Sequence, residues 1–117
     1  MIAFFDLVMA FNCVHDMAHP RAALKAIRHM IKPDGAFLWS EAQVGERLED
    51  NLTPVGRTLY GASTMHCMTV SLAQGGEGLG SAISVELARS LAAEAGFASL
   101  GPLPIKNPFH QIFLGRK

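Results

Sequence analysis

Four polar side chains of the kind that carry out chemistry follow an apolar run near the start of the sequence: Asn12, His15, Asp16 and His19. A histidine beside a carboxylate can act as a general base, because the carboxylate fixes the ring tautomer and stabilises the imidazolium that forms. Asp16 is adjacent to His15, and Glu41, which ends a later apolar stretch, is a second candidate for this carboxylate. The spacing alone also fits a histidine that only caps a loop backbone, so both interpretations stay open at this point.

The same region contains side chains that bind metals in other proteins. Cys13 and Cys67 could be assembled with His15 and His19 into one site, but no pair among them has a spacing known from zinc sites. We therefore predict no metal. Two cysteines so far apart in the sequence do not make a disulfide framework either, and we expect both to be reduced thiols.

Two strands and a helix must position these side chains. Residues 4–12, FFDLVMAFN, form a nearly continuous apolar run, the pattern of a strand that is covered on both faces of a parallel sheet. A helix is predicted from Pro20 to a turn at 32–35, and residues 36–42, AFLWSEA, are predicted as a second strand. A right-handed crossover makes such strands parallel, so the polar residues that follow each strand should face one crevice.

The rest of the chain predicts more helices and two short strands. In chain order, we expect an exposed polar loop at 43–53, a helical insertion at 54–73, a glycine-rich linker at 75–80, a helix between Ser84 and Gly96, an edge strand at 98–105 and a final strand at 110–117. The linker is not a phosphate loop, because it lacks the Lys-Ser/Thr ending and no strand leads into it. The predicted fold class is α/β, with one domain spanning residues 1–117.

The composition excludes several classes of function. The ten basic residues balance the ten acidic ones and are scattered, which argues against nucleic acid as a partner. The apolar N-terminal run is interrupted by Asp6 and is far shorter than the roughly 20 residues of a membrane span. We therefore expect a cytoplasmic protein that does not enter the membrane.

The order of the motifs resembles the second half of a class I S-adenosylmethionine-dependent methyltransferase. The segments that carry the resemblance are FDLVMAFNCVHDM, the following helix, IKPDGAFLWSEA, and the later LAAEAGF with its terminal strand pair. It implies part of a Rossmann-like sheet, with strands corresponding to 4-5-7-6 of the complete fold. Within the family, the chain is most similar to bacterial, O-methyltransferase-like enzymes that carry an N-terminal winged-helix region.

The resemblance also implies roles for the polar residues. His15 would be the general base that takes the proton from a hydroxyl of a small-molecule acceptor, with Glu41 and Asp16 as its carboxylate partners. Asn12 and Cys13 would lie beside the methyl donor, S-adenosylmethionine. Met17 stands where the family usually has an aromatic residue, and this leaves the acceptor pocket undefined.

Two features of the complete family fold are missing: the glycine-rich cofactor loop and the strands that would cover the free side of the strand at 4–12. No glycine-rich cofactor loop precedes a helix, so we expect an incomplete site that binds the cofactor poorly and is inactive alone. The strand at 4–12 would become an apolar edge, and a homodimer that pairs this strand with its copy would cover it.

The alternative to a methyltransferase is a non-catalytic dimeric α/β module that binds an apolar ligand or a partner chain. The thioethers of residues 65–68, MHCM, would suit such an adaptable pocket, although we predict plain core there.

Overall fold

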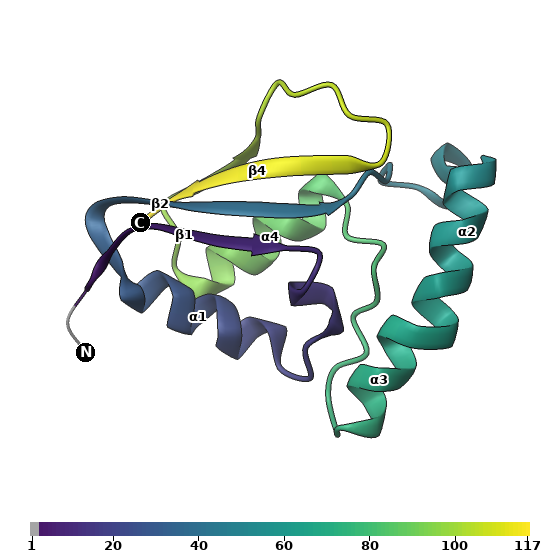
Figure 1. Ribbon diagram of the computed structural model, residues 1–117, viewed down its shortest axis with the longest axis horizontal. Helices are drawn as coiled ribbons and strands as arrows, with labels where there is room; N and C mark the ends of the chain where they lie inside the picture. The colour runs from purple at the N-terminus through teal and green to yellow at the C-terminus, as the bar shows by residue number, and fades with distance from the viewer. Residues whose placement is uncertain (1–2) are drawn as a thin grey trace.

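A four-stranded sheet with helices packed against it organises the molecule (Figure 1). The computed structural model describes residues 3–117. The strands lie in the order β1-β2-β4-β3, so that β1 and β3 are the two edges. This confirms the predicted α/β class, the predicted strand order and the edge position of the first strand.

The first three elements form the predicted crossover. β1 (Phe5–Phe11) and β2 (Ile31–Ala42) pair in parallel and are joined by α1 (Pro20–Met30), with Pro20 in the first turn, where its missing amide hydrogen is not needed. The turn predicted at 32–35 falls inside the bounds of β2, where it forms an irregularity at the start of the strand. Where β1 advances two residues, from Phe5 to Leu7, the paired residue on β2 advances from Ile31 to Ala36, so residues 32–35 bulge out of the ladder instead of running fully extended.

The predicted helical insertion is present as three consecutive helices. α2 (Pro54–Ala62) leads into a π-helical segment, η3 (Ser63–Cys67), and then into α3 (Met68–Ala73). Figure 1 shows that these three consecutive helices lie beside the end of the sheet rather than on its face. Within residues 3–117, no helix combines the length and the apolarity needed to span a membrane.

The C-terminal part confirms the expected helix and antiparallel strand pair. Two residues cap α4 (Val85–Ala95). The side chain of Ser84 caps the N-terminus by accepting a hydrogen bond from the Leu87 amide, and Gly96, with a φ of 92°, caps the C-terminus. β3 (Ser99–Pro102) pairs antiparallel with β4 (His110–Arg116), and β4 pairs antiparallel with β2. The edge strand is shorter than the predicted 98–105.

The hydrophobic core lies between one face of the sheet and helices α1 and α4. Phe37 and Trp39 alternate along β2 and are fully buried together with Phe113 of β4. The ring centroids of Trp39 and Phe113 are 5.8 Å apart. Leu24 of α1 and Leu91 of α4 complete the contact, and each fully buried side chain of this size contributes about 1.5–3 kcal/mol.

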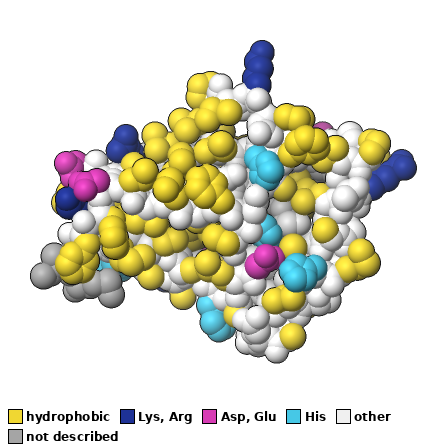
Figure 2. Space-filling view, viewed as in Figure 1, with side chains coloured by type: hydrophobic (Ala, Val, Ile, Leu, Met, Phe, Trp, Pro, Cys, Tyr) yellow, Lys and Arg dark blue, Asp and Glu magenta, His cyan; other side chains and the backbone are white. Residues whose placement is uncertain are grey.

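The opposite face of the sheet is uncovered in the described residues. Strand alternation places Val8 and Ala10 toward the core and Leu7, Met9 and Phe11 on the other side, where they are 48%, 56% and 53% exposed. Figure 2 shows hydrophobic side chains gathered over the strands. Exposed apolar surfaces beside an unpaired strand edge are typical of interaction sites in proteins.

Candidate functional site

The carboxyl ends of β1 and β2 bring the predicted polar residues together. The backbone amide of Asn12 donates a hydrogen bond to the carbonyl of Ser40 at 2.9 Å, which joins the two strand ends. A single helical turn, η1 (Val14–Asp16), follows β1. Val14 is fully buried in the core, so this turn has a fixed position at the sheet edge.

His15 lies on this turn and contacts the carboxylate that the sequence proposed for it. Its Nδ1 atom donates a hydrogen bond to Glu41 Oε2, and the Glu41 side chain is completely buried. Glu41 is two residues after Trp39 on the same face of β2, and the indole Nε1 donates to Glu41 Oε1 at 2.7 Å. Both carboxylate oxygens are therefore held by donors, and the imidazole is oriented by a carboxylate that is itself fixed.

This arrangement determines the protonation chemistry of His15. Because Nδ1–H is directed at Glu41, the neutral ring carries its free lone pair on Nε2. Burial lowers the pKa of His15, but the hydrogen bond and the charge of Glu41, helped by Asp16, outweigh burial and raise this pKa above its usual value. His15 is thus a stronger base than an isolated histidine.

Asp16 lies on the other side of the ring. Its Oδ1 atom is 3.3 Å from His15 Nε2, close enough to form an ion pair when the ring is protonated. The structure therefore joins His15, Glu41 and Asp16, the three residues predicted as catalytic, in one contact group. His19, the fourth polar residue of the opening motif, is exposed at the N-terminus of α1 and takes no part in this group.

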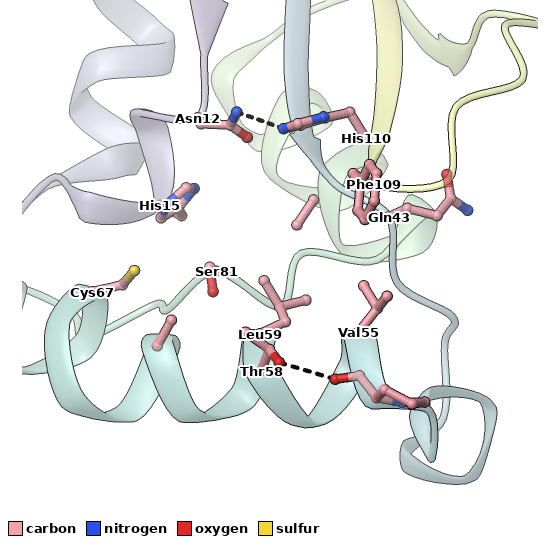
Figure 3. A pocket seen from close by; sticks show the side chains of 13 residues that line it. Asn12, His15, Gln43, Val55, Thr58, Leu59, Cys67, Ser81, Phe109 and His110 are labelled. Carbon is pink, nitrogen blue, oxygen red and sulfur yellow. Dashed lines mark hydrogen bonds between the residues drawn. The ribbon is translucent and has the colours of Figure 1, made fainter.

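An apolar cavity of about 550 Å³ opens next to His15 (Figure 3). One wall consists of Val55, Leu59 and other α2 side chains, and the opposite wall includes Phe109 at the start of β4. The volume falls within the roughly 300–1,000 Å³ of small-molecule sites, and such sites are apolar with a few directed polar groups. The cavity is therefore suited to a small, largely apolar molecule that presents a polar group to His15.

A buried asparagine holds the α2 wall in place. Asn51 accepts a hydrogen bond from the Gly45 amide at 2.8 Å, and its Nδ2 donates to the Arg47 carbonyl at 2.9 Å and to Tyr60 Oη at 3.2 Å. The prediction of an exposed loop at 43–53 is therefore wrong for Asn51 and for Val44, which is also buried. Sequence reasoning missed Asn51 because its partners, although they are near it in the chain, form no pattern that marks the asparagine as buried.

Asn12 and His110 form a polar pair at the mouth of the cavity. Asn12 has a φ of 46°, a conformation that asparagine tolerates better than most residues, and its Nδ2 donates to His110 Nε2 at 2.9 Å. This pair connects the end of β1 with the start of β4 across β2. His110 was expected only as a strand residue, and no local signal in the sequence marks its role.

The two cysteines occupy different environments and form no disulfide within residues 3–117. Cys13, predicted to lie beside a cofactor, packs against the core instead of lining the cavity, and burial and the charge of Glu41 raise the pKa of its thiol. Cys67 lines the cavity from η3. The expectation of plain core at 65–68 is wrong for Met65, which is 79% exposed, and for His66, which is also exposed; Cys67 is buried but belongs to the cavity lining rather than to the core cluster.

Comparisons with known proteins identify solved structures that share this fold. No protein-family profile matches the sequence, and no curated protein matches it significantly. Among solved structures, an O-methyltransferase family protein from Burkholderia thailandensis superposes with a TM-score of 0.66 at 20% identity over 98% of this chain. Human N-acetylserotonin methyltransferase in complex with S-adenosylmethionine superposes with a TM-score of 0.65 at 24% identity over 96% of this chain.

The structural similarity also extends to methyltransferases with a different acceptor atom. The carbon methyltransferase DszA superposes with a TM-score of 0.63 at 20% identity over 95% of this chain. The chain corresponds to 31%, 29% and 28% of the length of these three proteins, respectively. The comparisons therefore establish the fold of part of a methyltransferase, and the activity has to be argued from the site.

Proposed function

We propose that this chain forms the acceptor side of an S-adenosylmethionine-dependent methyltransferase site, at which a hydroxyl of a small apolar molecule is methylated. One observation carries this proposal: the Nδ1 atom of His15 is held by the buried Glu41, and the ring borders an apolar cavity at the carboxyl ends of β1 and β2. The similarity to solved methyltransferases of both oxygen and carbon acceptors supports the reaction class.

The residues of this chain have defined tasks in such a reaction. The cavity walls exclude water and align the acceptor, and Nε2 of His15 takes the proton of the acceptor hydroxyl as the oxygen becomes a nucleophile. Glu41 stabilises the imidazolium that results, and Asp16 adds a second negative charge beside Nε2. Loss of a general base of this kind costs on the order of 10²- to 10⁴-fold in rate.

The described residues do not fit S-adenosylmethionine as a complete site. The Asn12 amide, predicted to lie beside the donor, is already hydrogen-bonded to His110, and Cys13 does not line the cavity. No Asp or Glu is among the described residues that line it, so the hydroxyls of the cofactor ribose have no carboxylate partner there. We therefore confine the role of residues 3–117 to the acceptor, in line with a correspondence to the C-terminal half of the fold.

The uncovered strand supports a second part of the proposal, a homodimer through β1. Antiparallel pairing of two copies about Val8 would place Leu7 opposite Met9 and Phe5 opposite Phe11. Asp6 is the only charged residue of the strand and would face Ala10 of the copy, so no like charges meet. Such pairing would join both sheets into one and satisfy the outer edge of β1.

A non-catalytic module that binds an apolar ligand is the second candidate. The cavity favours it, since its lining is mostly apolar and lacks a carboxylate for the cofactor. The two candidates differ in what they require of His15. An acceptor site needs a hydrogen bond between Nε2 and the hydroxyl, whereas an apolar binding module does not distinguish a hydroxyl from its methyl ether.

Binding of a naphthol and of its methyl ether, followed by calorimetry, tests this difference. The naphthol should bind the wild-type chain more tightly, by on the order of tenfold, because its hydroxyl donates to Nε2 in a buried site. His15→Asn should abolish the preference. Asparagine can still donate to Glu41 from the position of Nδ1 but has no counterpart of Nε2, which avoids the roughly 3–5 kcal/mol cost of leaving a buried charge without its partner.

The matched control is His29→Asn, on the exposed side of α1, which should keep the preference of the wild type. Equal affinity of the wild-type chain for the alcohol and the ether would reject the acceptor site and favour the apolar module. A preference that survives in His15→Asn would place the hydroxyl at another residue.

A further inference from the structure

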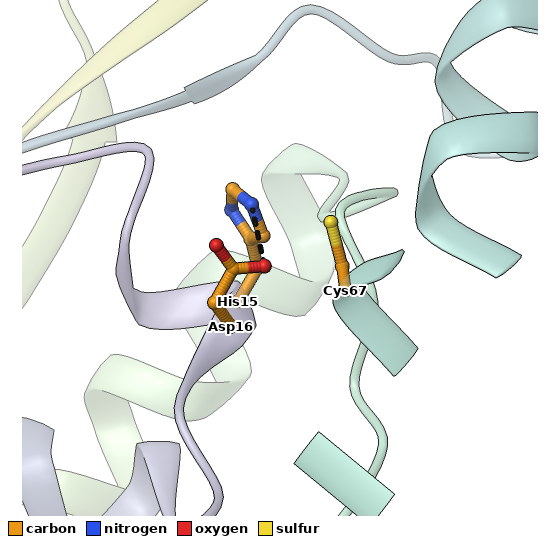
Figure 4. A group of neighbouring side chains, drawn as sticks. All are labelled: His15, Asp16 and Cys67. Atoms are coloured by element: carbon orange, nitrogen blue, oxygen red, sulfur yellow. Dashed lines mark ion pairs between the residues drawn. The ribbon is translucent and has the colours of Figure 1, made fainter. Parts of the chain in front are cut away.

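Three side chains of types that commonly bind metal ions lie close together beside the cavity (Figure 4). They are His15 and Asp16 of η1 and Cys67 of η3, and a ring nitrogen, a carboxylate oxygen and the Sγ atom of these residues all lie within 4.8 Å of one another. Sequence spacing did not reveal this group, because its third member lies on a different element. The convergence results from the packing of the helical insertion against the end of β1.

The group contains more hydrogen-bond acceptors than donors. Asp16 Oδ1 is inaccessible to solvent and, while the His15 ring is neutral, has no well-formed hydrogen bond among the described residues; its neighbours are His15 Nε2 and the Cys67 thiol. Glu41 lies on the other side of the imidazole and adds a second carboxylate. No Lys or Arg is among the described residues that line the adjacent cavity. A cation at this point would satisfy the orphaned oxygen.

The orientation of His15 matches that of a metal-bound histidine. In metal sites, the ring nitrogen that does not bind the ion usually donates to a carboxylate, which fixes the tautomer and makes the ligand more basic. Glu41 accepts from Nδ1 in this way, and Trp39 holds Glu41. Nε2 is thereby left as the ligand atom, 3.3 Å from Asp16 Oδ1. Two ligands of one tetrahedral zinc ion, each about 2.0 Å from it, are separated by roughly this distance.

We propose that His15, Asp16 and Cys67 bind a single divalent transition-metal ion, with zinc favoured by the nitrogen, oxygen and sulfur ligand set. Three protein ligands leave the fourth tetrahedral position open to water or to a polar group of a molecule in the cavity. Metal binding and proton acceptance at Nε2 use the same lone pair and exclude each other. Zinc would therefore inhibit the proposed base, so the metal-bound form and the base form of this site are alternative states.

The Cys67 thiol must lose its proton when the metal binds. Burial and the neighbouring Asp16 raise the pKa of this thiol, so the free group is protonated. A coordinated cation reverses this effect, because a thiol bound to zinc is deprotonated outright. One proton is thus released for each ion bound at Cys67.

Cobalt is a direct probe of this coordination. The full chain, treated with a chelator and then dialysed free of it, is titrated with Co²⁺ under reducing conditions, and zinc is used to displace the cobalt. One equivalent should bind and produce a near-ultraviolet thiolate-to-cobalt absorption band. Cys67→Ser should remove this band, and Asp16→Asn should keep it while weakening affinity by at least the roughly 10- to 100-fold known for losses in the surrounding shell.

Two variants serve as matched controls. Cys13→Ser removes the other cysteine, and His66→Asn removes an exposed histidine next to Cys67 in the sequence; both should bind cobalt like the wild type. Circular dichroism verifies that each variant is folded, and Asp16→Asn provides the test if Cys67→Ser is not. Absence of the thiolate band in the wild type, or cobalt affinity unchanged in Asp16→Asn, would overturn the proposal.

Discussion

His15 and Glu41 form a buried hydrogen-bonded pair, which mainly affects the tautomer, the orientation and the pKa of the imidazole. A buried ion pair adds little net stability, because both charges lose their hydration, but it fixes geometry and shifts proton affinity. The indole of Trp39 and the ring of His15 occupy both oxygens of Glu41, so the carboxylate cannot rotate away. The neutral histidine is therefore held ready to accept a proton at a defined position.

Replacing Glu41 should lower the pKa of His15. In Glu41→Gln the raising effects of the carboxylate are lost, while burial, which lowers the pKa, remains and is opposed only by Asp16. We expect the His15 ring to lose its proton at a lower pH than in the wild type. Long-range ¹H–¹⁵N NMR spectra recorded against pH, with a chelator present to keep metal away from the ring, give both titrations.

The amide of glutamine can accept from only one of the two donors, so the variant should also lose about 1–3 kcal/mol of unfolding free energy. A His15 titration that does not move in a folded Glu41→Gln protein would show that Glu41 does not control the base.

At the scale of single elements, the position of α2 decides the shape of the cavity. The N-terminus of α2 is capped by Thr53, whose Oγ1 accepts a hydrogen bond from the Gly56 amide at 3.0 Å. Gly56 also lies directly against the Asn51 backbone. A β-carbon at position 56 would lie 1.9 Å from the Asn51 carbonyl oxygen, so only glycine permits this approach.

Two glycine-to-alanine variants of the same helix should have opposite effects. Gly56→Ala should cost about 1–3 kcal/mol of unfolding free energy, because the Asn51 loop must move away from the helix. Gly61→Ala should stabilise the protein by up to about 1 kcal/mol, because no atom lies within 4 Å of the added carbon and alanine favours the helix. Chemical denaturation measures both.

The same pair of variants tests whether the cavity depends on this contact. Naphthol affinity should fall in Gly56→Ala and remain unchanged in Gly61→Ala. Destabilisation of both variants to the same extent would mean that the tight approach of α2 to Asn51 is not what holds the wall.

At the scale of the whole molecule, the uncovered face of the sheet is the dominant feature. The apolar side chains of β1 stand on a strand edge that has no partner among residues 3–117. Soluble proteins avoid long apolar edges of this kind, since they promote pairing with another chain. We therefore expect residues 1–117 to self-associate through β1.

Charges placed on this strand should break the proposed dimer. Met9→Lys should convert the chain to a monomer, since each copy would bring an unpaired charge into the apolar interface. Ile105→Lys is a matched control, because Ile105 is 52% exposed and Met9 is 56% exposed, and Ile105 lies in the loop between β3 and β4, the two strands that do not pair with β1. Sedimentation velocity at micromolar concentration measures the oligomeric state. A monomeric wild type would contradict the dimer, as would a dimer unaffected by Met9→Lys.

The sequence by itself determined the elements and their order. Periodicity and capping residues are local, so the strand at 4–12, the helix between Ser84 and Gly96 and the strand at 110–117 could be predicted from neighbours in the chain. The pairing of His15 with Glu41 was also within reach. His15 follows one of the two parallel strands of a crossover and Glu41 lies near the end of the other, and the carboxyl ends of such strands meet at one edge of the sheet.

Only the tertiary structure decided which side chains from distant elements share one site. His110 and Cys67 carry no local pattern that marks them, because each gains its role from the placement of β4 or of the helical insertion beside the end of β1. Within the predicted loop at 43–53, Val44 and Asn51 are buried, and Asn51 supports the cavity wall through its hydrogen bond to Tyr60 of α2. Periodicity identifies the face that an element buries, but the partners on that face are chosen by packing between segments far apart in the chain.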